Sequence, residues 1–342
     1  MHHLRSSIMK AVRISKFGGP EVLQLETVKI PVPQGNQVLV QVKAAGVNPV
    51  DTYIRNGGHP AKSEKDLPFT PGSDAAGLVA AVGPDVSDVQ VGDRVFVCDL
   101  NNLSGSYGEY MLVSSSRRVF PLPERLSFSQ GAALGVPYFT VLRALKYKAH
   151  AKSGETVFIH GASGGVGLAA CQLASAWPLD VVGTASTEEG AKLVRSAGAR
   201  IVVDHKDPHH RENLKKATNG KGFDIILEML SNVNLPLDLE VAAEYGRIVI
   251  VGSRGKVEID PRAIMNSETV VTAVMLGKTT DGEFAEMGKD LLKAINDQSV
   301  NPIIDLEIPL ERASEAHQAK SPVCGESRQA VRLDEKFTNL ST

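Results

Sequence analysis

The sequence is short of cysteine and of net charge, and each shortage argues against a class of protein. Its 342 residues include three cysteines, Cys98, Cys171 and Cys324, which lie far apart and form no Cys-x-x-Cys pair. We therefore expect neither a disulfide framework nor a cysteine-rich zinc site. The 37 Lys and Arg residues against 39 Asp and Glu residues give a net charge of −2. A dedicated binder of duplex nucleic acid would need a basic field that this balance does not supply.

Long apolar runs are also missing, although 42% of the residues are hydrophobic. No run approaches the roughly 18 residues that a membrane span needs. The first residues lack the apolar stretch of a signal peptide, and the last residues match no lipidation or retrieval signal. The sequence thus predicts a foldable chain without a membrane anchor, in the reducing environment of the cytoplasm.

The chain contains two regions with different sequence patterns. From residue 9 to about residue 125, short strand-like segments alternate with turns rich in proline and glycine, which is typical of antiparallel, barrel-like structure. Residues 10–14 and 38–44 are rich in Val and Ile, and residues 77–82 and 92–97 are predicted to form two strands joined by a polar turn. Residues 129–149 then show helical spacing, interrupted by Pro137.

Strands and helices alternate after that point, which predicts a doubly wound parallel sheet. Residues 166–177 and 188–197 have helical spacing, and residue 178 is a proline that stops the first of these helices. From about residue 282 the chain returns to helix and loop. The predicted strands comprise residues 155–160, 179–184, 201–204, 224–229, 247–252 and 269–276.

The strongest motif is a glycine-rich loop at residues 161–167 (GASGGVG), between a predicted strand and a predicted helix. Glycine lets the backbone turn sharply and lets a pyrophosphate approach the chain. The helix N-terminus adds unpaired N–H groups and a partial positive charge. The spacing is GxxGxxG and not the strict GxGxxG, so a tight turn without a ligand is the alternative. The flanking strand and helix favour a dinucleotide site.

The end of the second predicted strand bears on the choice between NAD and NADP. An acidic residue that would bind the ribose hydroxyls is expected about 20 residues past the loop, but residues 183–187 read GTAST. The missing negative charge permits a 2′-phosphate. Ser186 would donate a hydrogen bond to it, Lys192 would supply positive charge, and His205 would reach the same pocket, although a plain loop histidine is the alternative for His205. The sequence favours NADP.

Several motifs occur in order along most of the chain and carry a family resemblance. They are residues 17–23 (FGGPEVL), 46–55 (GVNPVDTYIR), 71–74 (PGSD), 92–95 (GDRV), 131–140, the glycine loop, 228–234 (EMLSNVN) and 251–255 (VGSRG). With these motifs the sequence resembles the zeta-crystallin-like quinone oxidoreductases, which are zinc-free members of the medium-chain dehydrogenase/reductase superfamily.

The resemblance implies an α/β protein in two parts: a GroES-like β-barrel catalytic domain and a Rossmann domain with a doubly wound parallel sheet, with NADPH held in a cleft between them. The predicted boundaries are residues 1–130 for the first part of the catalytic domain, 131–280 for the Rossmann domain and 281–342 for the return to the catalytic domain. From about residue 319 the C-terminal segment departs from the family pattern, and only residues 330–333 are strand-like.

The resemblance also implies the cofactor contacts and the assembly. Dimers or tetramers would pair through the edge strand near residues 269–276. The implied contacts to NADPH, together with Lys192 from the argument above, are Tyr53, Ser163, Gly164, Gly165, Val166, Ser186, His205, Asn234, Val251, Gly252, Ser253, Arg254, Val274, Met275 and Leu276.

Zinc-dependent medium-chain alcohol dehydrogenases need a Cys in a turn of the first domain and a His a short distance further on. The corresponding stretches here are residues 45–51 (AGVNPVD) and 71–74 (PGSD), which contain neither. A tetrahedral zinc ion would have too few ligands, so we expect no metal.

A quinone is already a good electron acceptor, so the protein has to supply proximity and orientation. Asn48 would hold the nicotinamide amide or a quinone oxygen, Tyr53 would stack or form a hydrogen bond beside the cofactor, and Asp51 would order these groups. Structural alternatives remain open: Asn48 as a turn starter, Asp51 as the N-cap of a short helix over residues 52–56, and Tyr53 as a core residue.

The predicted function is therefore NADPH-dependent, zinc-independent quinone reduction, for which the resemblance implies a semiquinone product. One alternative is an alkenal or enone reductase on the same scaffold. Another, also implied by the resemblance, is a crystallin-like structural protein or one that binds AU-rich RNA, although the sequence contains no RNA-binding motif.

Overall fold

The computed structural model describes residues 7–59, 62–100, 103–318 and 329–332. Within these ranges the chain divides into two compact units. Unit 1 contains the residues up to Val136 together with 302–318 and 329–332, and unit 2 runs from Pro137 to Asn301. No helix among the described residues is long and apolar enough to cross a membrane.

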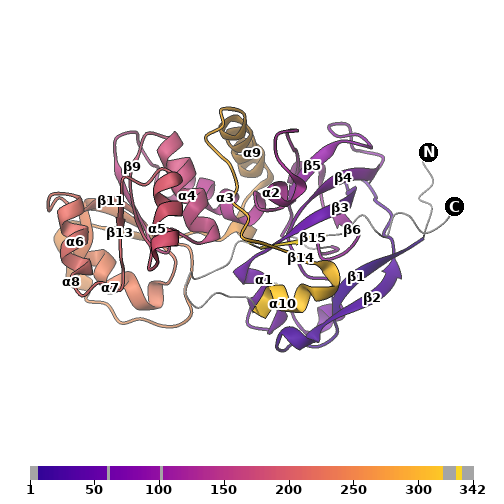
Figure 1. Cartoon of the computed structure of the whole chain (residues 1–342), viewed down its shortest axis with the longest axis horizontal. Helices are drawn as coiled ribbons and strands as arrows, with labels where there is room; N and C mark the ends of the chain where they lie inside the picture. Colours follow the sequence, from indigo (N-terminus) through magenta and orange to yellow (C-terminus); the bar gives the residue numbers. More distant parts are fainter. Residues whose placement is uncertain (1–6, 60–61, 101–102, 319–328, 333–342) are drawn as a thin grey trace. The chain divides into compact units, whose positions relative to one another are not determined.

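Unit 1 is built on antiparallel strands, as the sequence predicted (Figure 1). A seven-stranded sheet has the order β14-β15-β3-β4-β5-β7, with β6 also paired to β3, and β1 and β2 form a separate antiparallel pair. The elements are β1 (Ile8–Ile14), β2 (Leu23–Lys29), β3 (Val38–Val47), α1 (Pro49–Arg55), β4 (Asp74–Val82), β5 (Arg94–Cys98), β6 (Tyr110–Val113), β7 (Val119–Pro121), α2 (Phe128–Ala132), β14 (Leu306–Pro309), α10 (Ala313–Gln318) and β15 (Gln329–Arg332).

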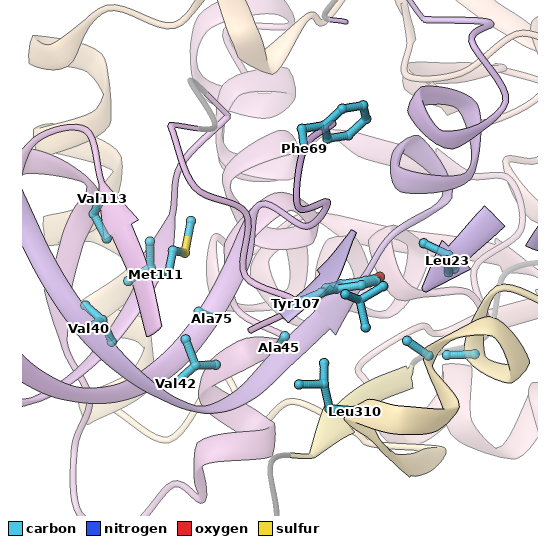
Figure 2. Packing of buried hydrophobic residues seen from close by; sticks show 14 of the residues in the cluster. Leu23, Val40, Val42, Ala45, Phe69, Ala75, Tyr107, Met111, Val113 and Leu310 are labelled. Atoms are coloured by element: carbon cyan, nitrogen blue, oxygen red, sulfur yellow. The ribbon is translucent and has the colours of Figure 1, made fainter. Parts of the chain in front are cut away.

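The core of unit 1 follows from the alternation of side chains along its strands. Val40 and Val42 of β3 point to the same face because successive strand residues alternate. They pack with Met111 of β6 and with Leu310, which directly follows β14. The part of the chain that returns to unit 1 after residue 301 therefore completes this core (Figure 2). Burying β-branched and aliphatic side chains of this size stabilises the fold by about 1.5–3 kcal/mol each.

The C-terminal segment contains one described element, the strand β15. Gln329–Arg332 pairs antiparallel with β3 and parallel with β14, so the strand is hydrogen-bonded on both edges. The strand-like character predicted for residues 330–333 is therefore confirmed up to Arg332. Residues 319–328 and 333–342, which include Cys324 and most of the atypical C-terminus, lie outside the described residues.

Unit 2 contains a six-stranded parallel sheet of order β10-β9-β8-β11-β12-β13, which confirms the predicted doubly wound sheet. The chain starts at β8 in the middle, moves outward to β10, and then returns to β11 on the other side. The elements are α3 (Gly135–Leu142, which begins at the unit boundary), β8 (Thr156–Ile159), α4 (Gly165–Ala176), β9 (Asp180–Thr184), α5 (Glu188–Ser196), β10 (Ile201–Val203), α6 (His210–Ala217), β11 (Phe223–Glu228), α7 (Ser231–Val241), β12 (Ala242–Ile250), α8 (Pro261–Ser267), β13 (Val270–Ala273) and α9 (Asp281–Asn296).

The order of strands determines where the site lies. Crossovers between parallel strands are right-handed, so reversing direction at β8 places the helices of the two halves on opposite faces of the sheet. Ligands of doubly wound sheets bind outside the carboxyl ends of the strands at such a reversal, which here falls at β8 and β11.

Helix α9 belongs to unit 2, so the boundary of the Rossmann-like unit lies at Asn301, later than the predicted residue 280. Phe284 of α9 packs against Phe139 of α3, with ring centroids 5.0 Å apart. Arg143 Nη1 lies 2.6 Å from Glu283 Oε2, and Lys146 Nζ lies 2.7 Å from Asp290 Oδ2. These contacts were not visible in the sequence because they join segments about 140 residues apart.

Pro137 does not interrupt a helix, contrary to the sequence expectation. The break falls at Ala133 and Leu134, between α2 and α3, and Pro137 lies in the first turn of α3. A proline is accommodated in that turn because the N–H it lacks would have had no partner within the helix. Helix α3 continues directly into a π-helical turn at Arg143–Lys148.

We predict that Val331→Pro destabilises the protein by about 1–3 kcal/mol, because β15 pairs on both edges and proline removes a ladder hydrogen bond. Chemical denaturation of the full chain measures the effect. Val331→Thr, which retains the N–H and a β-branched side chain, is the control. Equal stability of the proline and threonine variants would contradict the pairing of β15.

Candidate dinucleotide site

The glycine loop lies between β8 and α4, as the sequence predicted. Gly161 has a φ of +52°, a left-handed conformation that favours glycine. The N–H groups of Gly161 and Ala162 donate to the hydroxyl (3.0 Å) and the carbonyl (2.9 Å) of Thr184, at the end of β9. The loop is thereby fixed to the neighbouring strand before any ligand is present.

Gly167 is needed because the backbone approaches it closely. A Cβ atom at this position would lie 2.4 Å from the Gly161 carbonyl oxygen and 2.6 Å from the Ala162 Cα. Both contacts are with backbone, so no side-chain rotation relieves them. The last glycine of the motif thus allows α4 to pack against the loop, which is the role the third glycine has in dinucleotide-binding folds.

The first turn of α4 provides an anion-binding surface. The leading N–H groups of a helix have no partner within it, and the helix dipole places a partial positive charge there. Gly164 is the N-cap residue, and no side chain forms a capping hydrogen bond to the N-terminus. This end of the helix is therefore electrostatically suited to an anion.

Most of the other predicted cofactor residues of unit 2 lie just beyond the carboxyl ends of the remaining strands, whereas Lys192 lies in the second turn of α5 and Asn234 in the first turn of α7. Parallel strands present their carboxyl ends at one edge of the sheet, so the fold brings these residues to the edge that carries the glycine loop. Ser186 and Lys192 follow β9, His205 follows β10, Asn234 follows β11 and lies in α7, Val251, Gly252, Ser253 and Arg254 follow β12, and Val274, Met275 and Leu276 follow β13.

Around the end of β9, the side chains are suited to an anionic group. Ser186 is half-buried, whereas Lys192 on α5 and His205 after β10 are exposed. Thr187 caps α5 by accepting from the Gly190 N–H, and Glu188 and Glu189 occupy the first turn of that helix. The two glutamates therefore stabilise the N-terminus of α5 through its dipole.

Glu228, at the end of β11, organises the region around Asn234. Its Oε1 accepts hydrogen bonds from the Leu230 N–H and from Asn234 Nδ2, the latter at 3.2 Å. Its carbonyl oxygen accepts from the Val251 N–H at 2.8 Å. One residue thus links the ends of β11 and β12 to the start of α7.

His160 and Asp238 complete a buried cluster with Glu228. His160 Nε2 lies 2.6 Å from Asp238 Oδ1 and 3.1 Å from Glu228 Oε2, and both carboxyl groups are fully buried. Burial raises the pKa of Glu228 and of Asp238 to about 7 and lowers the pKa of His160. Among the described residues, this is the one group of His, Cys, Asp and Glu side chains whose ligand atoms are close enough to surround an ion.

The predicted catalytic residues Asn48, Asp51 and Tyr53 lie in unit 1, at the start of α1. Asn48 is the N-cap residue, and Asp51 is the third residue of the helix, where its Oδ2 accepts from the Asn48 N–H at 2.8 Å. The alternative of Asp51 as the N-cap is therefore wrong, because the helix begins earlier, at Pro49. Tyr53 is half-buried, so it is not a core residue.

Asp74 holds the side chain of Asn48. Its Oδ2 accepts from Asn48 Nδ2 and from the Val136 N–H, both at 2.8 Å. A Cβ at Gly135 would lie 2.1 Å from Asp74 Oδ1, so the carboxyl group fits against a backbone without a side chain. The two segments in which zinc-dependent enzymes would need Cys and His are thus joined here by an amide–carboxylate hydrogen bond.

The residues that support Asn48 and Asn234 were not predicted from the sequence. His160, Glu228 and Asp238 in unit 2, and Asp74, Tyr107 and His317 in unit 1, are buried and connected over long sequence separations. One signal was present in the sequence: the ionisable residues His160 and Glu228 stand at or next to the ends of the predicted strands 155–160 and 224–229. Nothing in the sequence paired them with their partners.

Comparison with known proteins gives a consistent result. Residues 34–124 match the alcohol dehydrogenase GroES-like domain, and residues 165–293 match the zinc-binding dehydrogenase domain. The chain is 49% identical over 312 residues to a quinone oxidoreductase of Sus scrofa and 48% identical to one of Homo sapiens, covering 91% of this chain and 93% of each relative.

Solved structures agree with the sequence relatives. A mycobacterial protein in complex with NADPH has a TM-score of 0.84 at 29% identity, covering 95% of this chain and 99% of that protein. A quinone oxidoreductase of Pseudomonas syringae has a TM-score of 0.83 at 28% identity with the same coverage.

We predict that the free energy of unfolding falls as the pH rises from about 4.5 to about 7, in part through Glu228. Its pKa is raised in the folded state, so the folded protein binds more protons in this window and loses stability as they dissociate. Glu228→Gln keeps the acceptor and removes the titration, and should flatten the dependence by roughly 1–3 kcal/mol.

Urea denaturation across this pH range provides the measurement, with Glu258→Gln at an exposed position as the control. A Glu228→Gln variant whose stability has the same pH dependence as that of the unaltered protein would contradict the raised pKa.

Proposed function

The chain belongs to the quinone oxidoreductase family of the medium-chain dehydrogenase/reductase superfamily, and from this premise we propose that it reduces quinones with NADPH and without a metal ion. The observation that carries the proposal is the glycine loop at the reversal point of the sheet, in a chain that matches quinone oxidoreductases over nine-tenths of its length. NADPH, when bound, supplies the reducing electrons.

In this proposal the residues of unit 2 bind the dinucleotide. Ser163, Gly164, Gly165 and Val166 hold the diphosphate at the N-terminus of α4. Ser186, Lys192 and His205 hold the 2′-phosphate, because no acidic side chain follows β9 in the place that would bind a free ribose hydroxyl. Asn234, residues 251–254 and residues 274–276 contact the remainder of the cofactor.

Residues of unit 1 act on the reacting groups. Asn48 uses one N–H for Asp74, and its side-chain oxygen faces the Asp51 N–H in a capping box. Its second N–H and the second lone pair of that oxygen are left for the nicotinamide amide or for a quinone oxygen. Tyr53 lies one turn further along α1 and contacts the cofactor, while Asp51 orders the turn. Quinones need no Lewis acid, so orientation by these residues suffices.

Purified protein should oxidise NADPH only when a quinone such as 1,4-naphthoquinone is added, and an α,β-unsaturated ketone should be a poorer substrate. Absorbance of the reduced nicotinamide follows the reaction. If the folded protein, verified by circular dichroism, oxidises no NADPH in the presence of quinones, the proposal fails.

Lys192→Glu should raise the KM for NADPH by about tenfold and leave that for NADH nearly unchanged, because a repulsive charge would face the 2′-phosphate. Lys152→Glu is the matched control, since it makes the same charge change just before β8, at the amino edge of the sheet. Equal effects of the two variants, or an equal loss for NADH, would exclude Lys192 from the 2′-phosphate site.

We also propose that two copies of the chain pair through β13. This strand is hydrogen-bonded only to β12 among the described strands, so its other edge is open. Val270 and Met275 are 52% and 51% exposed beside that edge. An edge strand with apolar side chains is suited to pairing with another chain.

Val270→Lys should convert the oligomer to smaller species in sedimentation experiments, because the charge would be buried on pairing. Val91→Lys, at an exposed valine of unit 1, is the control. An unaltered sedimentation coefficient for Val270→Lys would place the interface elsewhere.

A further inference from the structure

A chain of buried polar side chains in unit 1 connects the last described helix to the Asn48 turn. Arg55 Nη1 lies 3.0 Å from His317 Nδ1, and His317 Nε2 lies 3.0 Å from the Tyr107 hydroxyl. The Tyr107 hydroxyl donates to Asp51 Oδ2 at 3.4 Å, and that same oxygen accepts from the Asn48 N–H. Every residue in this chain is more than nine-tenths buried.

Arg55 fixes the direction of these hydrogen bonds. A guanidinium group has only donors, so His317 Nδ1 must accept. A neutral imidazole then carries its proton on Nε2 and donates it to the Tyr107 oxygen. The Tyr107 proton is left to point at Asp51. The sequence of donors and acceptors therefore runs one way, from Arg55 through His317 and Tyr107 to Asp51.

The geometry points to His317 as a positioning residue for Asn48: through Tyr107 it keeps Asp51 oriented as the acceptor that anchors the Asn48 N–H. The inference rests on the proposed function, in which Asn48 acts on the nicotinamide or the quinone. It gives α10 a part in the reaction that the sequence did not reveal, because His317 lies 262 residues from Arg55.

The charges around Asp51 make this orientation sensitive to protons. Asp74 of β4 is a second buried carboxyl group, whose pKa is raised by burial and by the nearby charge of Asp51, and which also contacts the Cys98 thiol. Arg55 of α1 supplies the positive charge and itself faces Glu21. Burial raises the pKa of Asp51 to about 7, whereas the hydrogen bonds from Asn48 and Tyr107 lower it. Loss of the Tyr107 hydroxyl must therefore raise it further.

Three variants test the individual hydrogen bonds between Arg55, His317, Tyr107 and Asp51. Tyr107→Phe removes the hydroxyl and preserves the ring that packs in the core (Figure 2). His317→Gln retains a donor near the position of Nε2 but loses the acceptor for Arg55, and His317→Asn does the reverse. We expect Tyr107→Phe and His317→Asn to lower kcat for quinone reduction about tenfold, with the KM for NADPH changed less than twofold. His317→Gln should retain kcat within about threefold.

The pH dependence of kcat distinguishes this positioning role from a purely structural role of Tyr107 and His317, which would not shift it. Ionised Asp51 is the competent acceptor, so kcat should rise as the pH passes about 7, and this limb should shift to higher pH in Tyr107→Phe but not in His317→Gln. Unfolding curves verify that each variant is folded. An unshifted limb in a folded Tyr107→Phe variant would overturn the inference.

NMR tests the network without relying on turnover. Nitrogen shifts should show His317 neutral and protonated on Nε2, and the carboxyl carbon of Asp51 should titrate near pH 7 and at higher pH in Tyr107→Phe. A proton on Nδ1, or an unchanged Asp51 titration, would refute the network even if quinones are reduced. The predicted NMR result in a protein that reduces no quinone would refute the proposed function alone.

Discussion

The close approach of backbone to backbone at residues 161–167 is the constraint on which the dinucleotide site depends. Gly161 turns with a positive φ, and Gly167 lies so near the loop that a single added carbon atom would collide with it. This contact packs the start of α4 against the loop, and the first N–H groups of the helix have no partner within it and can bind an anion. The parallel sheet then brings all the other dinucleotide contacts proposed in unit 2 to the same edge.

Buried carboxyl groups support the proposed site residues in both units. Asp51 and Asp74 hold the backbone and the side chain of Asn48, and Glu228 holds Asn234. Burial of each carboxyl raises its pKa to about 7, which is the ordinary consequence of removing a charge from water. Such groups cost stability when ionised, but they fix the orientation of an amide side chain that would otherwise rotate freely.

Much of the fold was predictable because it is encoded locally. The strand before the glycine loop, the helix after it and the alternation of later strands follow from hydrophobic periodicity and from proline and glycine positions. The glycine loop was located for the same reason. Helix α9 was assigned to the wrong side of the boundary because its contacts with α3 and the π-helical turn that follows are distant in sequence.

The supporting residues of the site were not predictable on this basis. The alternative of Asp51 as an N-cap rested on a local signal, one acidic residue before a short helix. Its actual partner, Asn48, could be identified only from the true start of α1 at Pro49. His317 and Tyr107 are 210 residues apart, and no periodicity relates them. The local sequence pattern identifies the glycine loop as a phosphate-binding motif. The buried hydrogen bonds that orient the reacting side chains, in contrast, depend on tertiary structure.

The most direct measurement is a crystal structure of the protein with NADPH. We predict that the diphosphate oxygens accept hydrogen bonds from the backbone N–H groups of Gly165 and Val166, because the Gly164 N–H already donates to the Gly161 carbonyl, with the 2′-phosphate beside Ser186 and Lys192. A cofactor whose diphosphate lies away from the N-terminus of α4 would contradict the account.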